Sequence, residues 1–239
     1  MIRAFLVTFI TFAYMLVFGP PVVIYAMLTG RGDPIYRTGV LGARLALWLA
    51  GVQVEVRGRE RIPRGRPVVF MANHQSNCDP PALLLVLPKV LVLVKKEFFR
   101  VPIIGRGMTL VDFIRVDRRN REQALDAVER GVLALKAGKP FLVYPEGTRS
   151  PDGRLQGFKK GVFVMAIKAG APIVPISVSG SSKIMRKGEF VMRPGRVRIT
   201  FHDSISTEGL TIEDRDLVIE RVRQAILTGL EKDEWPEGV

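Results

Sequence analysis

The stretch Asn73-His74-Gln75-Ser76-Asn77-Cys78-Asp79 separates two segments of opposite character, and it decides how the rest of the chain is interpreted. The apolar run at 67–72 before it is typical of a buried strand. Pro80 and Pro81 after it are typical of the first turn of a helix. His74 is therefore predicted where a strand ends and a helix begins, a position that commonly carries the chemistry of an α/β domain.

Asp79 stands at the expected N-cap of that helix, and capping alone is one explanation for it. Pro80 and Pro81 have no N–H, so Asp79 meets fewer backbone donors than an ordinary cap does. Its carboxylate is then freer to accept a hydrogen bond from His74. A carboxylate that holds an imidazole fixes its tautomer and stabilises the imidazolium, as a general base requires. We predict that His74 and Asp79 form a catalytic pair.

Cys78 is the only cysteine of the chain and lies in the same loop. A thiol nucleophile is one interpretation, but a small buried side chain is favoured because only His74 beside it is basic. A single cysteine excludes an internal disulfide and fits a reducing compartment. The other histidine, His202, is expected to be a surface residue at a strand end. Two histidines also exclude a multi-histidine metal site within one chain.

The composition indicates an anionic partner. The 239 residues form one large domain, or one domain with an appendage, and 36 basic minus 23 acidic residues give a net charge of +13. Such a charge suits nucleic acid, an anionic membrane surface or a phosphorylated substrate. Nucleic acid is disfavoured because no recognised motif is present and the aromatic residues are not interleaved with the basic ones.

Residues 4–28 are almost wholly apolar, and Gly19-Pro20-Pro21 predicts a break or kink within them. A second helix is expected at 35–49 with Arg44 in its middle. Its rise of about 22 Å is short for a hydrocarbon core of ~30 Å. We predict that residues 1–50 form a two-helix hairpin embedded in one leaflet. The alternatives are a single span ending near Leu28, a cleaved signal peptide and an internal hydrophobic hairpin.

Residues 51–239 are predicted to form an α/β domain with a mixed, mostly parallel central sheet of about six or seven strands flanked by helices. Strands are expected at 52–56, 67–72, 90–94, 110–116, 140–144, 173–178 and 197–201. Helices are expected from Pro80, from the Asn120 cap to Ala137, and at 157–169 and 213–231. The apolar segment 98–104 is too broken for one long helix, and it faces lipid, an acyl chain or the core.

The turn Glu146-Gly147-Thr148-Arg149 has the chemistry to bind a phosphate group. Gly147 lets backbone N–H groups approach an anion, Thr148 offers a hydroxyl and Arg149 offers a bidentate fork. Alone, the turn is more commonly a strand end with an exposed arginine. Together with the His74 loop, it makes a distinctive combination.

This combination resembles the glycerophospholipid acyltransferase family, whose members include 1-acylglycerol-3-phosphate acyltransferases. The first family block, N-H-x-x-x-x-D, corresponds to 73–79. The third, F-P-E-G-T-R-S, corresponds to 144–150, with Tyr144 in place of phenylalanine. The second corresponds to 112–118, where Asp112 replaces a common glycine, so both Arg115 and Arg118 stay candidates for the substrate-facing arginine. The fourth corresponds to 171–176, and the resemblance covers roughly residues 52–205.

The resemblance implies that His74 deprotonates the free sn-2 hydroxyl of 1-acyl-sn-glycerol 3-phosphate, which then attacks an acyl thioester to give phosphatidic acid. Asp79 would orient His74. The residues that would hold the phosphate are Lys95, Arg115 or Arg118, Glu146, Gly147, Thr148 and Arg149.

The resemblance further implies no metal, no cofactor and no acyl-enzyme, with acyl-CoA or an acyl-carrier protein as co-substrate. The expected partners are membrane lipids, lysophosphatidic acid and an anionic membrane surface, at the cytoplasmic face of the cell membrane. Other acceptors, such as glycerol 3-phosphate or another lysophospholipid, stay open. So does a lipid or thioester hydrolase that uses the same His–Asp pair on water.

Overall fold

The structure is a computed structural model and describes residues 2–117, 120–189 and 191–238. The strands are β1 (Val52–Arg57), β2 (Val69–Ala72), β3 (Leu91–Lys95), β4 (Ile114–Val116), β5 (Phe141–Val143), β6 (Ile173–Ser179) and β7 (Gly195–Phe201). The α-helices are α1 (Ile2–Thr29), α2 (Asp33–Ala50), α3 (Asp79–Val86), α4 (Ile104–Leu110), α5 (Arg121–Lys136), α6 (Gly161–Ala169), α7 (Ser181–Ile184) and α8 (Arg215–Thr228).

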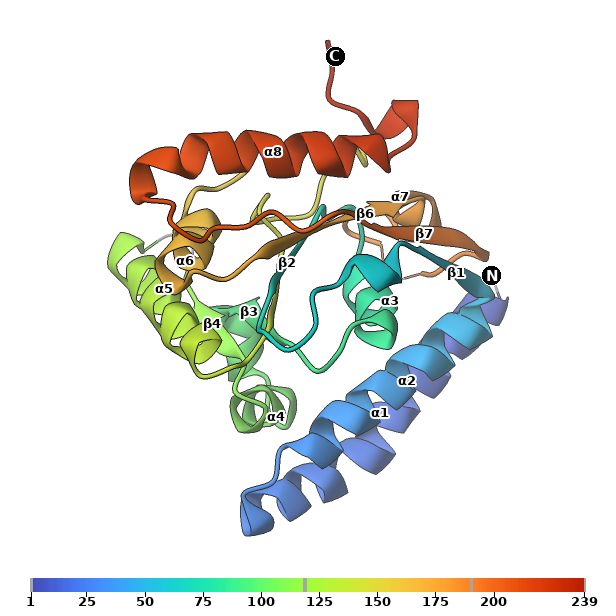
Figure 1. Cartoon of the computed structure of the whole chain (residues 1–239). Helices are drawn as coiled ribbons and strands as arrows, with labels where there is room; N and C mark the ends of the chain where they lie inside the picture. Colours follow the sequence, from blue (N-terminus) through green and yellow to red (C-terminus); the bar gives the residue numbers. More distant parts are fainter. Residues whose placement is uncertain (1, 118–119, 190, 239) are drawn as a thin grey trace.

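One seven-stranded sheet organises the domain, with the strand order β1-β7-β6-β2-β5-β3-β4. The β6–β7 pair is antiparallel and the other neighbouring pairs are parallel. Helices cover both faces of the sheet (Figure 1). The predicted mixed, mostly parallel sheet flanked by helices is confirmed.

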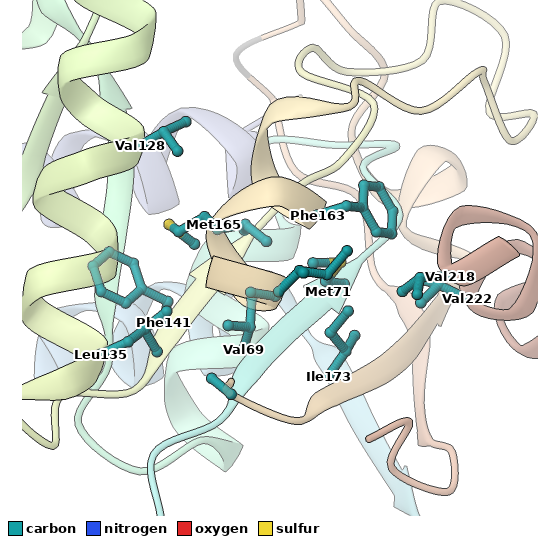
Figure 2. Packing of buried hydrophobic residues seen from close by; sticks show 14 of the residues in the cluster. Val69, Met71, Val128, Leu135, Phe141, Phe163, Met165, Ile173, Val218 and Val222 are labelled. Carbon is teal, nitrogen blue, oxygen red and sulfur yellow. The ribbon is translucent and has the colours of Figure 1, made fainter. Parts of the chain in front are cut away.

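Strand β2 lies inside the sheet, and all four of its residues are buried. Val69 and Met71 face a core shared with α5, α6 and α8, as Figure 2 shows, whereas Phe70 and Ala72 face a second core shared with α2 and α3. Because successive side chains of a strand point to opposite faces, burial on both faces explains the unbroken apolar run. This packing fixes the point at which β2 ends and the His74 loop begins.

The neighbouring strands β2, β5, β3 and β4 run parallel, so their carboxyl ends open at the same edge of the sheet. The His74 loop follows β2 and the Glu146 turn follows β5. Lys95 is the last residue of β3, and Arg115 lies in the edge strand β4. Sheet topology alone therefore gathers residues that are distant in sequence.

Helices α1 and α2 form an antiparallel hairpin that projects from the domain (Figure 1). Arg3 Nε donates to the carbonyl oxygen of Leu49 at 3.1 Å, and Tyr14 Oη donates to that of Thr38 at 3.0 Å. Helix α2 ends at Gly51, whose φ of 70° is left-handed and favours glycine. The predicted two-helix hairpin is present, and its depth in a membrane stays a prediction.

Of the break or kink predicted at Gly19-Pro20-Pro21, the break is wrong, because α1 runs continuously through both prolines. Proline has a helical φ, and the two prolines remove the N–H donors for two carbonyls four residues earlier, but the helix continues beyond them. Helix α1 is the one helix within the described residues that is long and apolar enough to cross a membrane, over Phe5–Thr29. Only 11% of its most apolar window is buried, which contradicts an internal hairpin.

Several predicted element limits also shift. The strand expected at 110–116 begins at Ile114, because α4 continues to Leu110 and Asp112 turns the chain with a φ of 63°. The helix expected at 157–169 begins at Gly161, and the helix expected at 213–231 covers Arg215–Thr228. The Asn120 cap is confirmed, since its side chain accepts a hydrogen bond from the backbone N–H of Gln123 at 3.0 Å.

Candidate active site

His74 and Asp79 form the predicted hydrogen bond, with 2.7 Å between Nδ1 and Oδ2. Asp79 is fully buried, whereas the His74 side chain keeps 16% of its surface exposed. An ionised carboxylate can only accept, so Nδ1 carries the proton and Nε2 keeps a free lone pair. The ring is therefore held in the tautomer that can take a proton from an incoming group.

Asp79 organises the loop before α3 rather than capping the helix. The N-cap residue is Cys78, and Asp79 is the first residue of α3. Asp79 Oδ2 also accepts hydrogen bonds from the backbone N–H groups of Gln75 and Ser76, each at 2.8 Å. The predicted N-cap position of Asp79 is therefore wrong. Its carboxylate accepts from loop amides in place of the helix N–H groups that the prolines lack. One oxygen holds both the backbone of the loop and the catalytic ring.

Glu146 joins the two sequence motifs through the His74 backbone. Its Oε1 accepts from the backbone N–H of His74 at 2.6 Å, and its Oε2 accepts from the backbone and side-chain N–H groups of Gln156 at 3.0 and 3.1 Å. The backbone N–H of Ser150 donates to the carbonyl oxygen of His74 at 2.7 Å. Burial, the largest cause, raises the pKa of Glu146 to about 7. Both oxygens of Glu146 are already engaged by protein donors.

Two further contacts, absent from the sequence prediction, fix the residue before His74 and the His74 ring. The side chain of Asn73 pairs with the backbone of Val178 in β6, donating at 2.8 Å and accepting at 2.7 Å. The Tyr144 ring stacks on the His74 ring at 4.0 Å between centroids and 19° between planes. Burial and the charge of Asp79 raise the pKa of Tyr144 well above its usual value. Asn73 and Tyr144 lie in the first and third family blocks, but the sequence analysis assigned neither of them a role.

The proposed phosphate turn contains a backbone conformation that only glycine adopts easily. Gly147 has a φ of 74°, and a Cβ added to it would meet the Lys159 side chain at 3.2 Å. Thr148 is exposed, and Arg149 is half-buried. The Nη1 atom of Arg149 is buried and has no hydrogen-bond partner within the described residues. Lys159 lies beside this turn and is a basic residue that the sequence analysis did not single out.

The remaining candidates lie farther along the same sheet edge. Lys95 is exposed and lies 3.5 Å from Glu97 between Nζ and Oε1. Arg115 is exposed on β4, and Arg118 lies outside the described residues. Lys96, rather than Lys95, pairs with the buried carboxylate of Asp117.

The structure also shows the surroundings of Cys78 and His202, which the sequence analysis did not favour as catalytic residues. Burial raises the pKa of the Cys78 thiol to about 12, so a thiolate is disfavoured at neutral pH. The expected surface position of His202 is wrong: the residue is buried, and its Nε2 lies 2.7 Å from Ser177 Oγ. Ser177 Oγ donates to the carbonyl oxygen of Ile226 in α8, so Nε2 of His202 carries a proton. Burial lowers the pKa of His202 to about 4.

An apolar groove of about 580 Å³ lies between the hairpin and the domain. Pro81 and Leu84 of α3 line it, as do residues 101–104. Pro81 follows Asp79 by two residues, so the groove approaches the catalytic loop. Among the residues that the structure describes, no three His, Cys, Asp or Glu side chains are grouped as metal ligands.

Comparisons with known proteins agree with this geometry. Residues 53–179 match the family described as Acyltransferase. A 1-acyl-sn-glycerol-3-phosphate acyltransferase of Chlamydomonas reinhardtii is 36% identical over 74% of this chain, which spans only 53% of that protein. A protein of the same name from Limnanthes alba is 31% identical, with 81% of this chain and 69% of that protein covered.

A solved structure shares the fold over nearly the whole chain. The crystal structure of the 1-acyl-sn-glycerophosphate (LPA) acyltransferase PlsC from Thermotoga maritima superimposes with a TM-score of 0.80 at 27% identity. The match covers 95% of both chains. It therefore includes the hairpin as well as the sheet.

Proposed function

The chain belongs to the Acyltransferase family, and on that premise we propose that it transfers a fatty acyl group from an acyl thioester to the sn-2 hydroxyl of 1-acyl-sn-glycerol 3-phosphate. The product is phosphatidic acid. The observation that carries this proposal is the 2.7 Å hydrogen bond between His74 and Asp79, located beside the Glu146–Arg149 turn. It supplies a general base next to a candidate phosphate site.

The reaction begins with proton transfer. His74 Nε2 takes the proton of the acceptor hydroxyl while Asp79 stabilises the positive charge on the ring. The oxygen attacks the thioester carbonyl carbon and forms a tetrahedral intermediate. When the intermediate collapses, the carbon–sulfur bond breaks, and the imidazolium returns its proton to the departing thiolate. An ester and a free thiol result, with no covalent acyl-enzyme.

The acceptor's phosphate binds at the turn that holds the backbone of His74. Arg149 presents a guanidinium with an unpartnered buried Nη1, and Lys159 lies against Gly147. Lys95 and Arg115 extend this basic edge, and Thr148 adds a hydroxyl. Glu146 has a different role from the one expected, because both of its oxygens accept protein N–H groups. We assign Glu146 to positioning His74 rather than to contacting phosphate.

The acyl chain lies in the apolar groove between the hairpin and α3 and α4. The hairpin exposes large apolar side chains on α1, which suit the interior of one leaflet. The net charge of +13 favours the anionic cytoplasmic face of the membrane. An acceptor embedded in that leaflet then reaches the site without leaving the bilayer, and residues 51–239 act as the catalytic domain.

A panel of acceptors tests this function. One labelled thioester, presented as acyl-CoA and as acyl-carrier protein, is incubated with vesicles containing 1-acylglycerol 3-phosphate, glycerol 3-phosphate or a lysophospholipid with a larger head group. We expect the label in phosphatidic acid. Thiol release without an acylated product would identify a hydrolase instead.

Arg149 variants test the phosphate site. Arg149→Ala should raise the acceptor's KM on the order of tenfold, and Arg149→Lys should restore part of that loss because it keeps the charge but not the fork. Arg64→Ala is the control, since Arg64 is exposed in the turn before β2 and lies at the opposite edge of the sheet. An unchanged acceptor KM in Arg149→Ala would remove this turn from phosphate recognition.

A further inference from the structure

A second cleft, polar rather than apolar, lies against the backbone of the catalytic loop. Its volume is about 400 Å³, which is within the usual range of small-molecule sites. The residues that line it include Gln75, Ser150, Ser182, Arg186 and Lys187. Gln75 follows His74 directly, and the N–H of Ser150 donates to the His74 carbonyl oxygen. The cleft therefore borders the backbone of the loop that carries the general base.

Gln75 brings an unused hydrogen-bond donor to this cleft. The residue is 2% exposed, and its Nε2 has no hydrogen-bond partner within the described parts of the chain. Its Oε1 accepts from Ser181 Oγ at 3.3 Å, which leaves the NH₂ end for another acceptor. A buried amide without a partner is costly, so a ligand carbonyl or hydroxyl at this position would satisfy it.

The carboxylates that line the cleft are already engaged. Asp152 Oδ1 accepts from Ser150 Oγ at 2.8 Å and from the backbone N–H of Arg154 at 3.0 Å. Asp233 lies 2.9 Å from Lys183, and Glu234 accepts from the N–H of Gly180 at 2.7 Å. Asp233 is thus paired with a cation, whereas Asp152 and Glu234 are held by neutral hydrogen-bond donors.

The cations at the mouth of the cleft are less constrained. Arg186 and Lys187 are exposed, and neither forms a salt bridge with another described residue. Lys187 Nζ donates to the carbonyl oxygen of Arg149 at 2.8 Å, which ties the cleft to the proposed acceptor turn. The cleft thus combines a buried amide donor inside with positive charge at its entrance.

We propose that this cleft binds the phosphopantetheine arm of the acyl donor, with its thioester end directed toward His74 and its phosphate at Arg186. The arm carries amide and hydroxyl groups along its length, which can accept from Gln75. Its far end carries a phosphate, which suits the exposed cations of the cleft. The apolar groove and the polar cleft then serve the two chemically different parts of the reaction's substrates. This inference rests on the proposed function and extends it to the donor.

Acyl-CoA and acyl-carrier protein share this arm, so the test uses both, together with acyl-pantetheine, which lacks the phosphate. The acyl chain is the same in all three donors. Arg186→Ala should raise the KM for acyl-CoA or acyl-carrier protein about five- to tenfold, the loss expected for one charge-assisted contact. The KM for acyl-pantetheine and for the lipid acceptor should not change. Arg64→Ala is the charge-matched control and should leave every KM unchanged.

A binding measurement supports the kinetics independently. Calorimetry with 4′-phosphopantetheine alone should show weaker binding to Arg186→Ala than to the wild type, with pantetheine binding both equally. Equal donor KM values in wild type and Arg186→Ala would overturn the inference while leaving the acyl transfer intact. A rise in the acceptor KM instead would assign the cleft to the lipid phosphate. Absence of transfer from any donor by the wild type would contradict the proposed function itself.

Discussion

The His74 loop and the α1–α2 hairpin belong to one chain but are built by opposite kinds of contact. In the loop, specific hydrogen bonds hold buried polar side chains: Asp79 Oδ2 alone accepts three. In the hairpin, large apolar side chains face outward, with Phe5 71% and Leu28 83% exposed. A buried polar group depends on each partner, whereas apolar surface acts roughly in proportion to its area.

This difference predicts how each region responds to substitution. A single change in the loop removes a partner that no neighbour replaces, so its effect on turnover is large. A single change on the hairpin removes a fraction of a broad apolar surface, so several changes are needed for a comparable effect. The loop is specified residue by residue, and the hairpin is specified by its average character.

The largest effect is expected from His74→Ala, which should lower turnover on the order of 10²–10⁴-fold through loss of the general base. Glu146 and Ser150 bind the backbone of His74 rather than its ring, so their contacts persist in this variant. Labelled phosphatidic acid formation measures turnover, and circular dichroism checks the fold. Near-normal turnover with an intact fold would remove His74 from the mechanism.

A double substitution on the hairpin, Phe5→Glu with Phe9→Glu, should come next. Both side chains are exposed, and transferring each to lipid is worth about 1.5–3 kcal/mol. Binding to anionic vesicles, measured by sedimentation, should fall on the order of 10²–10⁴-fold.

The matched control for the hairpin lies on α5. Leu125 and Leu133 are 57% and 67% exposed, close to the 60% of Phe9, but they lie away from the hairpin. Leu125→Glu with Leu133→Glu should leave vesicle binding unchanged. Equal losses from the two double variants would mean that general surface apolarity, rather than the hairpin, drives membrane binding.

Glu146→Gln tests the buried carboxyl that joins the two motifs. The pKa of Glu146 is raised to about 7 from an unfolded value of 4.5, so its stabilising contribution is present below pH 4.5 and is lost as the pH rises through 7. The full loss is about 3 kcal/mol. Between pH 4.5 and 8, the free energy of unfolding of the wild type should therefore fall by about that amount relative to Glu146→Gln.

Urea unfolding at several pH values measures this difference, with the same detergent for both proteins. The glutamine keeps a carbonyl oxygen that can accept from the His74 N–H but has no charge to lose. Parallel pH curves for the two proteins would show that Glu146 does not titrate in this range.

The sequence predicts those features that depend on neighbours along the chain. The apolar run at 67–72 predicts β2 because burial on both faces needs unbroken apolarity. Pro80 and Pro81 predict the hydrogen bond between His74 and Asp79, because they leave the Asp79 carboxylate with fewer backbone donors. The Asn120 cap is likewise predicted from its local sequence.

Features that depend on sheet order are not predicted. The Asn73 side chain pairs with Val178, 105 residues away, only because β6 lies next to β2. Gln156 completes the environment of Glu146 through a loop whose path no local pattern defines. The continuous α1 shows the converse, since two prolines predict a break locally, whereas the helix continues beside α2. Local rules fail where distant segments supply the partner.

The smallest effect is expected from Tyr144→Phe, which separates the ring contact of the loop from its hydrogen bonds. The ring stacks on His74, but its buried hydroxyl has no hydrogen-bond partner within the described residues. Removing that hydroxyl should raise the free energy of unfolding by about 1 kcal/mol and leave turnover within about twofold. Tyr36→Phe is the control. The Tyr36 hydroxyl donates to the carbonyl oxygen of Pro88 at 3.3 Å, so its removal should lower the free energy of unfolding. A tenfold loss of turnover in Tyr144→Phe would mean that the hydroxyl acts in the reaction. Asp79 alone would then not be sufficient to set the tautomer of His74.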